Sequence, residues 1–172
     1  MILVKRTEAD VQALAGSPPV DLSDDGKNWL EVRVTKPWGH EIERYRDERC
    51  SITWLHLHTH QETSMHCHTG KTTILYIAGG DGFLNTLNSS HRVGIGNIVV
   101  IEKGAFHQMR SGDTALLLYE LETPPNKNDL VRLADRYGRG QGYTQEKTHS
   151  MQSPEEVARL RELWLWCESQ KR

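Results

Sequence analysis

The sequence predicts an all-β domain built as a sandwich or a small barrel. Between about residues 29 and 121 it contains seven short runs that alternate between apolar and polar residues or are rich in β-branched ones. Glycine, asparagine, aspartate and serine separate many of these runs, and no helical pattern lies between them. Strands at this spacing are typical of sandwiches and barrels. A chain of 172 residues is long enough for one such domain with modest additions.

The expected strands follow one another with short connections. In chain order they are WLEVRV (29–34), HEIERYR (40–46), SITWLHLH (51–58), TTILYIA (72–78), GFLNTL (82–87), NIVVIE (97–102) and ALLLYEL (115–121). Pro124 and Pro125 follow the last run. We expect them to end the strand region, because proline cannot donate to a sheet ladder.

Helices are expected only near the two ends of the sequence. Thr7 with Asp10 resembles a helix start, with Val11 and Leu14 as its apolar side. The segment 153–172 has stronger signals, namely a serine N-cap, a proline at the first helical position and a glutamate that completes a capping box. Its apolar stripe is expected to pack on the barrel or on a second subunit; the stripe consists of Val157, Leu160, Leu163, Trp164 and Cys167.

These signals divide the chain into three parts. Residues 1–28 form an N-terminal extension, 29–143 the barrel domain and 144–172 a C-terminal helical extension. We also expect a homodimer, because edge strands and an apolar terminal helix favour self-association.

Charge and composition exclude several classes of partner. The formal net charge of −2 and a pI of about 6.5 provide no basic field for nucleic acid or an anionic membrane. No run approaches the ~20 apolar residues needed to cross a bilayer, and the apolar start is too short for a signal peptide. Three widely spaced cysteines do not look like a disulfide framework. The sequence therefore predicts a cytoplasmic protein with reduced thiols.

The histidines are the most informative residues. Five of the nine lie between His56 and His68. On a strand, alternate residues share a face, so His56, His58 and His60 would lie together, as would His66 and His68. Such a pair can direct two neutral imidazoles at one divalent ion such as Zn, Fe, Ni or Mn. A polar strand face of hydrogen-bonded histidines is the alternative interpretation.

With its second histidine segment, the chain resembles the cupins. The first cupin motif includes H-x-H and a later glycine, which match His66, His68 and Gly79 or Gly80. In the second motif, the matching residues are Gly96, Gly104 and His107. The resemblance implies a small antiparallel barrel, the double-stranded β-helix or jelly roll. It also implies that His66, His68 and His107 converge inside as metal ligands.

One departure from the cupin pattern concerns the acidic ligand. Its position falls on Thr72 or Thr73, so a hydroxyl replaces a carboxylate. A neutral three-histidine site would leave more positions open for water or substrate. Other residues could compensate, namely Glu62, His58, His60 or Glu120. The same departure permits a site without metal, in which the histidines touch the substrate directly.

A second resemblance narrows the family. VTKPWGHE (34–41) and NDLVRLADRYGR (128–139) are similar to the two ends of the mannose-6-phosphate isomerase domain of bifunctional isomerase/guanylyltransferases. TSMHCHTGKTTILYIAGG (63–80) is closer still to small cupins of bacterial surface-polysaccharide gene clusters. The resemblance covers roughly residues 34–143.

The resemblance also implies substrate contacts. The motif arginine of the isomerase falls on Lys71, its glutamate on Thr73, and the arginine implicated in catalysis on Arg139. Lys71 and Arg139 are thus the expected catalytic residues, and with Thr73 they are the expected substrate-binding residues. Cationic side chains of this kind suit a phosphate or a nucleotide diphosphate.

Three functions follow as alternatives. The first is a metal-binding cupin that isomerises or epimerises a phosphorylated or nucleotide-linked sugar during surface-polysaccharide biosynthesis. The second is a non-catalytic cupin that binds a sugar or nucleotide sugar, favoured by the loss of the glutamate at Thr73. The third is a three-histidine iron dioxygenase, against which the sugar-phosphate motifs count.

Overall fold

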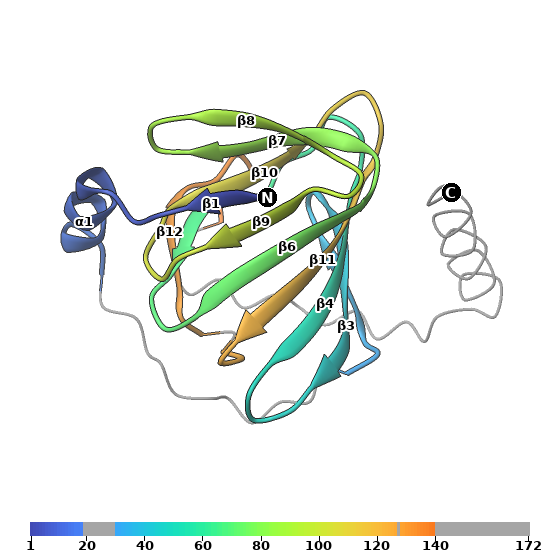
Figure 1. Cartoon of the computed structure of the whole chain (residues 1–172), viewed down its shortest axis with the longest axis horizontal. Coiled ribbons are helices and arrows are strands. Elements are labelled where there is room, and N and C mark those ends of the chain that lie inside the picture. The colour runs from blue at the N-terminus through green and yellow to red at the C-terminus, as the bar shows by residue number, and fades with distance from the viewer. Residues whose placement is uncertain (19–29, 127, 140–172) are drawn as a thin grey trace, which may run out of the picture.

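Two β-sheets make up most of the computed structural model, which describes residues 1–18, 30–126 and 128–139 (Figure 1). The seven-stranded sheet contains, in spatial order, β1 (Ile2–Val4), β9 (Ile98–Ile101), β6 (Thr72–Gly79), β11 (Leu116–Thr123), β4 (Ser51–Leu57), β3 (Gly39–Arg46) and β2 (Arg33–Lys36). The five-stranded sheet contains β12 (Leu130–Ala134), β5 (Met65–His68), β10 (His107–Ser111), β7 (Asp81–Thr86) and β8 (Ser90–Gly94).

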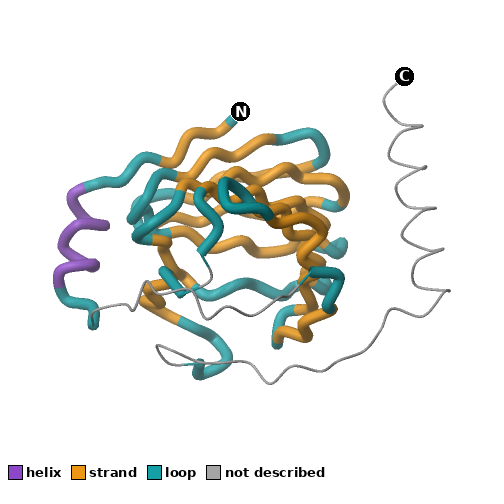
Figure 2. The backbone as a smooth tube through the Cα atoms, turned by 90° about the horizontal axis from the view of Figure 1, so that it is seen from below, coloured by secondary structure: helices purple, strands orange, loops and turns teal. Residues whose placement is uncertain are grey.

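The sheets face each other and enclose a shared interior, and the single described helix, α1 (Glu8–Ala15), lies outside them (Figure 2). Every pair of neighbouring strands is antiparallel except β1 and β9. This arrangement confirms the all-β sandwich, and each of the seven expected runs overlaps a strand.

The expectation that Pro124 and Pro125 end the strand region is wrong. β12 follows them and pairs with β5, where Leu130 faces His68 and Arg132 faces His66 across the strands. β12 is a short edge strand with one neighbour in its sheet. Such a strand depends on the partner that tertiary folding brings to it rather than on its own sequence pattern.

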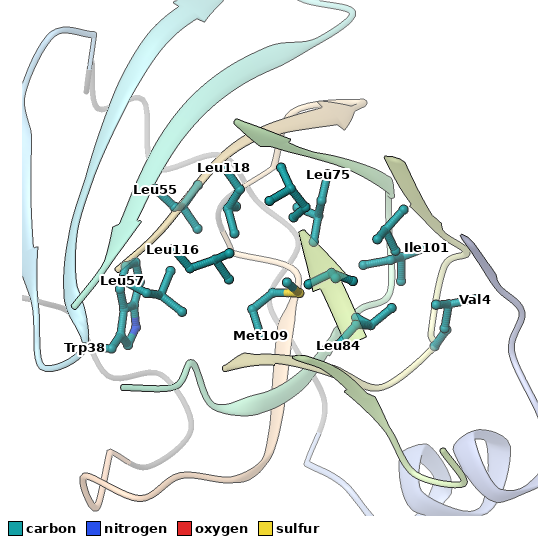
Figure 3. Packing of buried hydrophobic residues seen from close by; sticks show 14 residues of the cluster. Val4, Trp38, Leu55, Leu57, Leu75, Leu84, Ile101, Met109, Leu116 and Leu118 are labelled. Atoms are coloured by element: carbon teal, nitrogen blue, oxygen red, sulfur yellow. The ribbon is translucent and has the colours of Figure 1, made fainter. Parts of the chain in front are cut away.

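One half of the interior is apolar. Leu75, Leu116 and Leu118 of the seven-stranded sheet point towards Leu84 and Met109 of the five-stranded sheet (Figure 3). All five are at most 3% exposed. Each fully buried side chain of this size contributes ~1.5–3 kcal/mol through removal of apolar surface from water. This half therefore holds the two sheets together.

The other half of the interior is polar. Alternate residues of β4, β6 and β11 face the interior, and along each strand these residues change from apolar to polar. The polar residues are Ser51, Thr53, Thr73, Glu120 and Glu122. Polar side chains in a barrel interior need partners, so this half is where a binding site is expected.

Helix α1 packs against the outer face of the five-stranded sheet. Thr7 and Asp10 form a capping box at the expected helix start. Ala13 and Leu14 pack against a small cluster of Cys67, Phe106 and Val131. Val11, expected on the apolar side, is 49% exposed, and the buried member of the helix is Asp10. The carboxylate of Asp10 has a specific partner, since its Oδ1 accepts a hydrogen bond from the Phe106 N–H at 2.9 Å.

The domain boundaries stay a prediction. β1, within the proposed N-terminal extension, pairs with β9 of the barrel. The expected helix at 153–172 lies outside the described residues. In the part of the chain that the structure describes, no helix has the length and hydropathy to cross a membrane.

Candidate metal centre

His66, His68 and His107 converge in the interior. Two lie on β5 and the third begins β10, where His107 is the cross-strand partner of His66. One ring nitrogen from each lies within 4.8 Å of the others, and the ring centroids are 4.5 to 5.9 Å apart. Cys67 points to the opposite face, into the cluster beneath α1, as its position between the two histidines predicts.

The Nδ1 atoms of the three histidines already have oxygen partners. Nδ1 of His66 lies 2.8 Å from the Ser64 carbonyl, and that of His107 lies 3.0 Å from the Ala105 carbonyl. Nδ1 of His68 lies 2.8 Å from Oδ1 of Asp129. Because these oxygens only accept, each Nδ1 carries the proton and each Nε2 keeps a lone pair. Histidines that ligate metals almost always have such a partner, so the donor set fits a divalent transition metal.

Burial keeps these imidazoles neutral. It lowers the pKa of His107 from 6.5 to about 4, with the neighbouring His68 adding to the effect. Burial followed by His107 and His68 lowers the pKa of His66, and burial followed by Lys71 lowers that of His68. Neutral imidazole is the form that binds a metal ion, so the site is ready for one at neutral pH.

Carboxylates face the triad from the seven-stranded sheet. Glu120 and Glu122 on β11 each place an oxygen within 4.8 Å of a His68 ring nitrogen and of each other. Glu122 accepts a hydrogen bond from the Ser51 hydroxyl at 3.0 Å and forms an ion pair with Lys71. Glu120 is partly exposed, whereas Glu122 is buried. An acidic group is therefore present even though Thr73 replaces the expected one.

Lys71 is buried beneath the site. Its ammonium pairs with Glu122, lies 3.4 Å from Oδ1 of Asp129, and donates to the Asn126 carbonyl at 2.5 Å. Three oxygen partners match the three donors of an ammonium group. Lys71 is thus joined to the triad through Asp129, which also holds His68.

Thr73 also faces the polar half of the interior. It is the cross-strand partner of Glu122 and is 1% exposed. Its Oγ1 is buried without a hydrogen-bond partner. A buried hydroxyl of this kind costs free energy unless a ligand or water satisfies it. The substrate contact expected of Thr73 stays a prediction.

Arg139 is buried and held by Asp135. Its Nε lies 3.1 Å from both carboxylate oxygens and its Nη2 lies 2.5 Å from Oδ1. Burial, followed by the charge of Arg139, lowers the pKa of the Arg132 guanidinium. Arg132 is in turn the cross-strand partner of His66. The guanidinium of Arg132 therefore lies on the β12 side of the triad, and the guanidinium of Arg139 is close enough to Arg132 to affect it.

The histidines from 56 to 60 do not share one face. His56 and His58 lie with His40, on the other side of the seven-stranded sheet from its core leucines. The side chain of His60 is 69% exposed, and its backbone is left-handed, with a φ of 58°. The strand ends at Leu57, so the alternation on which the expectation depended stops before His58.

Sequence reasoning missed Asp129 as a partner of the site. Its side chain is fully buried, accepts hydrogen bonds from His68 and from the Gly70 N–H at 3.1 Å, and forms an ion pair with Lys71. Burial alone would raise the pKa of Asp129, but the hydrogen bond from His68 and the charges of His68 and Lys71 lower it. Its place in the motif at 128–139 was the available signal.

No model of a known protein family matches the sequence, and the search of curated proteins gave no match either. Solved structures do match. CapF from Staphylococcus aureus, a capsular polysaccharide assembling protein, is 18% identical with a TM-score of 0.52, over 64% of this chain and 33% of that one. An uncharacterized protein with a double-stranded β-helix domain from Klebsiella pneumoniae is 13% identical with a TM-score of 0.51, over 72% and 95%.

A third structure, KdgF from a Halomonas species, is 15% identical with a TM-score of 0.50, over 60% of this chain and 94% of that one. Identities this low carry the fold and not the activity. The matched architecture agrees with the two facing sheets. The chain has the cupin fold, the double-stranded β-helix.

Proposed function

We propose that this protein is a metal-binding cupin that isomerises or epimerises a phosphorylated or nucleotide-linked sugar. The observation that carries the proposal is the triad of His66, His68 and His107, whose Nδ1 atoms are occupied and whose Nε2 atoms are left for an ion. When bound, a divalent ion such as Zn, Fe, Ni or Mn would polarise the carbonyl and hydroxyl oxygens of the sugar.

Glu120 is the proposed proton carrier. Isomerisation and epimerisation both remove a proton from a carbon next to a carbonyl and return one, which requires a positioned base. Glu120 faces the triad from β11 and is partly exposed, so a substrate can reach it. Glu122, on the same face of β11, is buried and bound by Lys71 and Ser51.

We assign Lys71 a positioning role and Arg139 a role in substrate binding. Lys71 fixes Glu122 and Asp129, and through Asp129 it affects His68. Arg139 and Arg132 supply positive charge on the side of the triad where an anionic group would lie. The hydroxyl of Thr73 is the proposed partner for a sugar hydroxyl.

The proposed setting is the synthesis of a surface polysaccharide in the cytoplasm. CapF, which shares the fold, is named for assembling capsular polysaccharide. Cys50 and Cys67 are free thiols, as a reducing compartment favours.

Metal content is the first test. Tag-free protein purified without added metal is compared with a His66→Ala/His107→Ala variant by mass spectrometry. We expect close to one ion per chain to be lost in the variant. An equal metal content in both proteins, with both folded, would contradict the inner metal site.

Proton exchange is the second test. The protein is incubated in D₂O with sugar phosphates and nucleotide sugars, and deuterium incorporation next to the carbonyl is followed by NMR. We expect Glu120→Gln to lose at least a hundredfold in exchange rate, since general-base catalysis contributes typically ~10²–10⁴-fold. Glu48→Gln, at an exposed loop position, is the matched control.

A non-catalytic sugar-binding cupin is the second candidate. Thr73 stands where the isomerase has a glutamate, and the ammonium of Lys71 is fully engaged, which favours binding without chemistry. Ligand binding without deuterium exchange would favour this candidate. Iron-dependent oxygen uptake would favour the dioxygenase instead.

A further inference from the structure

A second group of three histidines lies outside the inner triad. His40 is the second residue of β3, His56 lies on β4, and His58 follows the end of that strand. One ring nitrogen from each lies within 4.8 Å of the others. The ring centroids of His40 and His56 are 4.9 Å apart, and those of His56 and His58 are 5.3 Å apart. We define these three residues as the outer triad.

The backbone brings the outer triad together. His40 is the cross-strand partner of His56, and the Trp38 carbonyl accepts a hydrogen bond from the His58 N–H at 2.9 Å. Gly39 has a φ of +148°, and a Cβ there would lie 1.9 Å from the His56 carbonyl oxygen and 3.2 Å from the His58 ring. Only glycine permits this close approach, so the turn before β3 lies directly against the end of β4.

The rings of the outer triad are suited to bind a cation. Burial, followed by the charge of Arg33, lowers the pKa of His40 to about 3, and burial followed by His58 lowers the pKa of His56. Both rings are therefore neutral at pH 7. The Nη2 of Arg33 lies 3.4 Å from Nδ1 of His40. A guanidinium only donates, so that Nδ1 holds a lone pair whose present partner is a long, replaceable hydrogen bond.

We propose that His40, His56 and His58 bind a second divalent transition-metal ion on the outer face of the seven-stranded sheet. Three imidazole ligands with a water as fourth ligand suit Zn, Co, Ni or Cu. Metal–nitrogen bonds of about 2.0–2.1 Å place tetrahedral ligands roughly 3.4 Å apart. The rings must therefore move closer together, which the exposed side chain of His58 allows.

The two triads are separate sites. His56 lies five residues along β4 from Ser51, which contacts Glu122 at the level of the inner triad. At about 3.3 Å per residue this is roughly 17 Å, and the outer triad lies on the opposite face of the sheet. One ion cannot serve both triads, so the outer site does not depend on the proposed sugar chemistry. An ion there would link the start of β3 to the end of β4.

The test counts cobalt ions. Tag-free, chelator-treated protein is titrated with Co²⁺ in equilibrium dialysis, and the visible absorption of tetrahedral cobalt is recorded. We expect two ions per chain for the unmodified protein and one for a His56→Ala/His58→Ala variant. The matched control, His60→Ala/His91→Ala, removes two histidines from outside both triads and is expected to bind two.

Two further variants make the result decisive. The His66→Ala/His107→Ala variant is expected to keep one ion at the outer triad, so loss of the inner metal and loss of the outer metal are distinguishable. His58→Ala changes one exposed ring and is expected to weaken the outer ion at least tenfold, even if the double variant does not fold. Equal Co²⁺ binding by the unmodified protein and the folded His58→Ala or His56→Ala/His58→Ala variant would overturn the proposal.

Discussion

Among single residues, Asp129 connects His68 of the inner site with the buried ammonium of Lys71. It is fully buried, accepts a hydrogen bond from Nδ1 of His68 at 2.8 Å, and lies 3.4 Å from the Lys71 ammonium. A carboxylate in this position fixes the orientation of the imidazole and makes Nε2 a better ligand. The charge on Asp129 also offsets the buried charge of Lys71.

Replacing Asp129 tests this role. We expect Asp129→Ala to lower the affinity for Zn²⁺ roughly 10–100-fold, as loss of such a partner usually does. Competition with a chromophoric chelator measures the affinity. Asp113→Ala, in which the exposed carboxylate near His60 is removed, is the control and should retain full affinity. Unchanged affinity in a folded Asp129→Ala protein would show that the contact does not support the metal ligand.

A pH dependence follows from His107. In the unfolded chain His107 takes up a proton near pH 6.5, and in the folded protein near pH 4. Between these values the unfolded state binds more protons, so the free energy of unfolding of the metal-free protein falls as the pH decreases. From the two pKa values we expect His107 to contribute on the order of 2 kcal/mol to this loss between pH 7 and pH 5.

Urea unfolding at the two pH values measures the effect. The loss of stability should be smaller in His107→Gln than in the unmodified protein. His91→Gln, at an exposed position, should leave it unchanged. If both variants show the full pH dependence, His107 is not the group responsible.

At the scale of elements, α1 supports the loop that leads to His107. Asp10 is 3% exposed, and its two oxygens accept from the Phe106 N–H and from the Thr7 N–H and hydroxyl. Phe106 immediately precedes His107. The carboxylate of Asp10 therefore caps the helix and also holds the loop that leads to His107. This double role explains why the buried residue of this helix is acidic.

Asp10→Ala should therefore affect both stability and metal binding. We expect a loss of about 2–3 kcal/mol in the free energy of unfolding, because the cap and a buried backbone hydrogen bond are removed together. Metal affinity should fall as well, since the position of His107 is no longer fixed. Glu8→Ala, an exposed change in the same helical turn, is the comparison in urea unfolding and metal competition. Equal behaviour of the two variants would contradict the anchoring role.

On the scale of the whole molecule, the barrel separates an apolar half from a polar one. The leucines of β6 and β11 hold the sheets together, while polar residues further along the same strands face the triad. Buried charged groups such as Lys71 and Glu122 can therefore lie in the polar half of the interior. They do not weaken the apolar half, which supplies most of the stability.

The outer surface near β1 predicts the oligomeric state. Leu3 is 51% and Ile98 40% exposed, and Leu3 lies beside Val100 on the outer face. We expect a homodimer by sedimentation, and Leu3→Glu/Ile98→Glu should shift it to the mass of one chain. Val11→Glu on α1, which is 49% exposed, should remain dimeric. A single-chain mass for the unmodified protein would refute the dimer.

Local patterns alone predicted much of the fold and part of the site. Alternation and β-branched residues located the main strands, and the capping signals of Thr7 and Asp10 located α1. The spacing of His66 and His68 placed their side chains on one face and Cys67 on the other. These features depend on the period of a strand or the first turn of a helix, both of which a short segment of sequence specifies.

The tertiary structure decided which of these side chains contact one another. Asp129 meets His68 across 61 positions of sequence, and Ser51 meets Glu122 across 71. β12 and the outer triad likewise exist only because particular strands pair in a particular register. Register between distant strands is set by the packing of the whole interior, and no local segment carries that information. The sequence by itself therefore determined which residues can act, and the assembled sheets decided which of them meet.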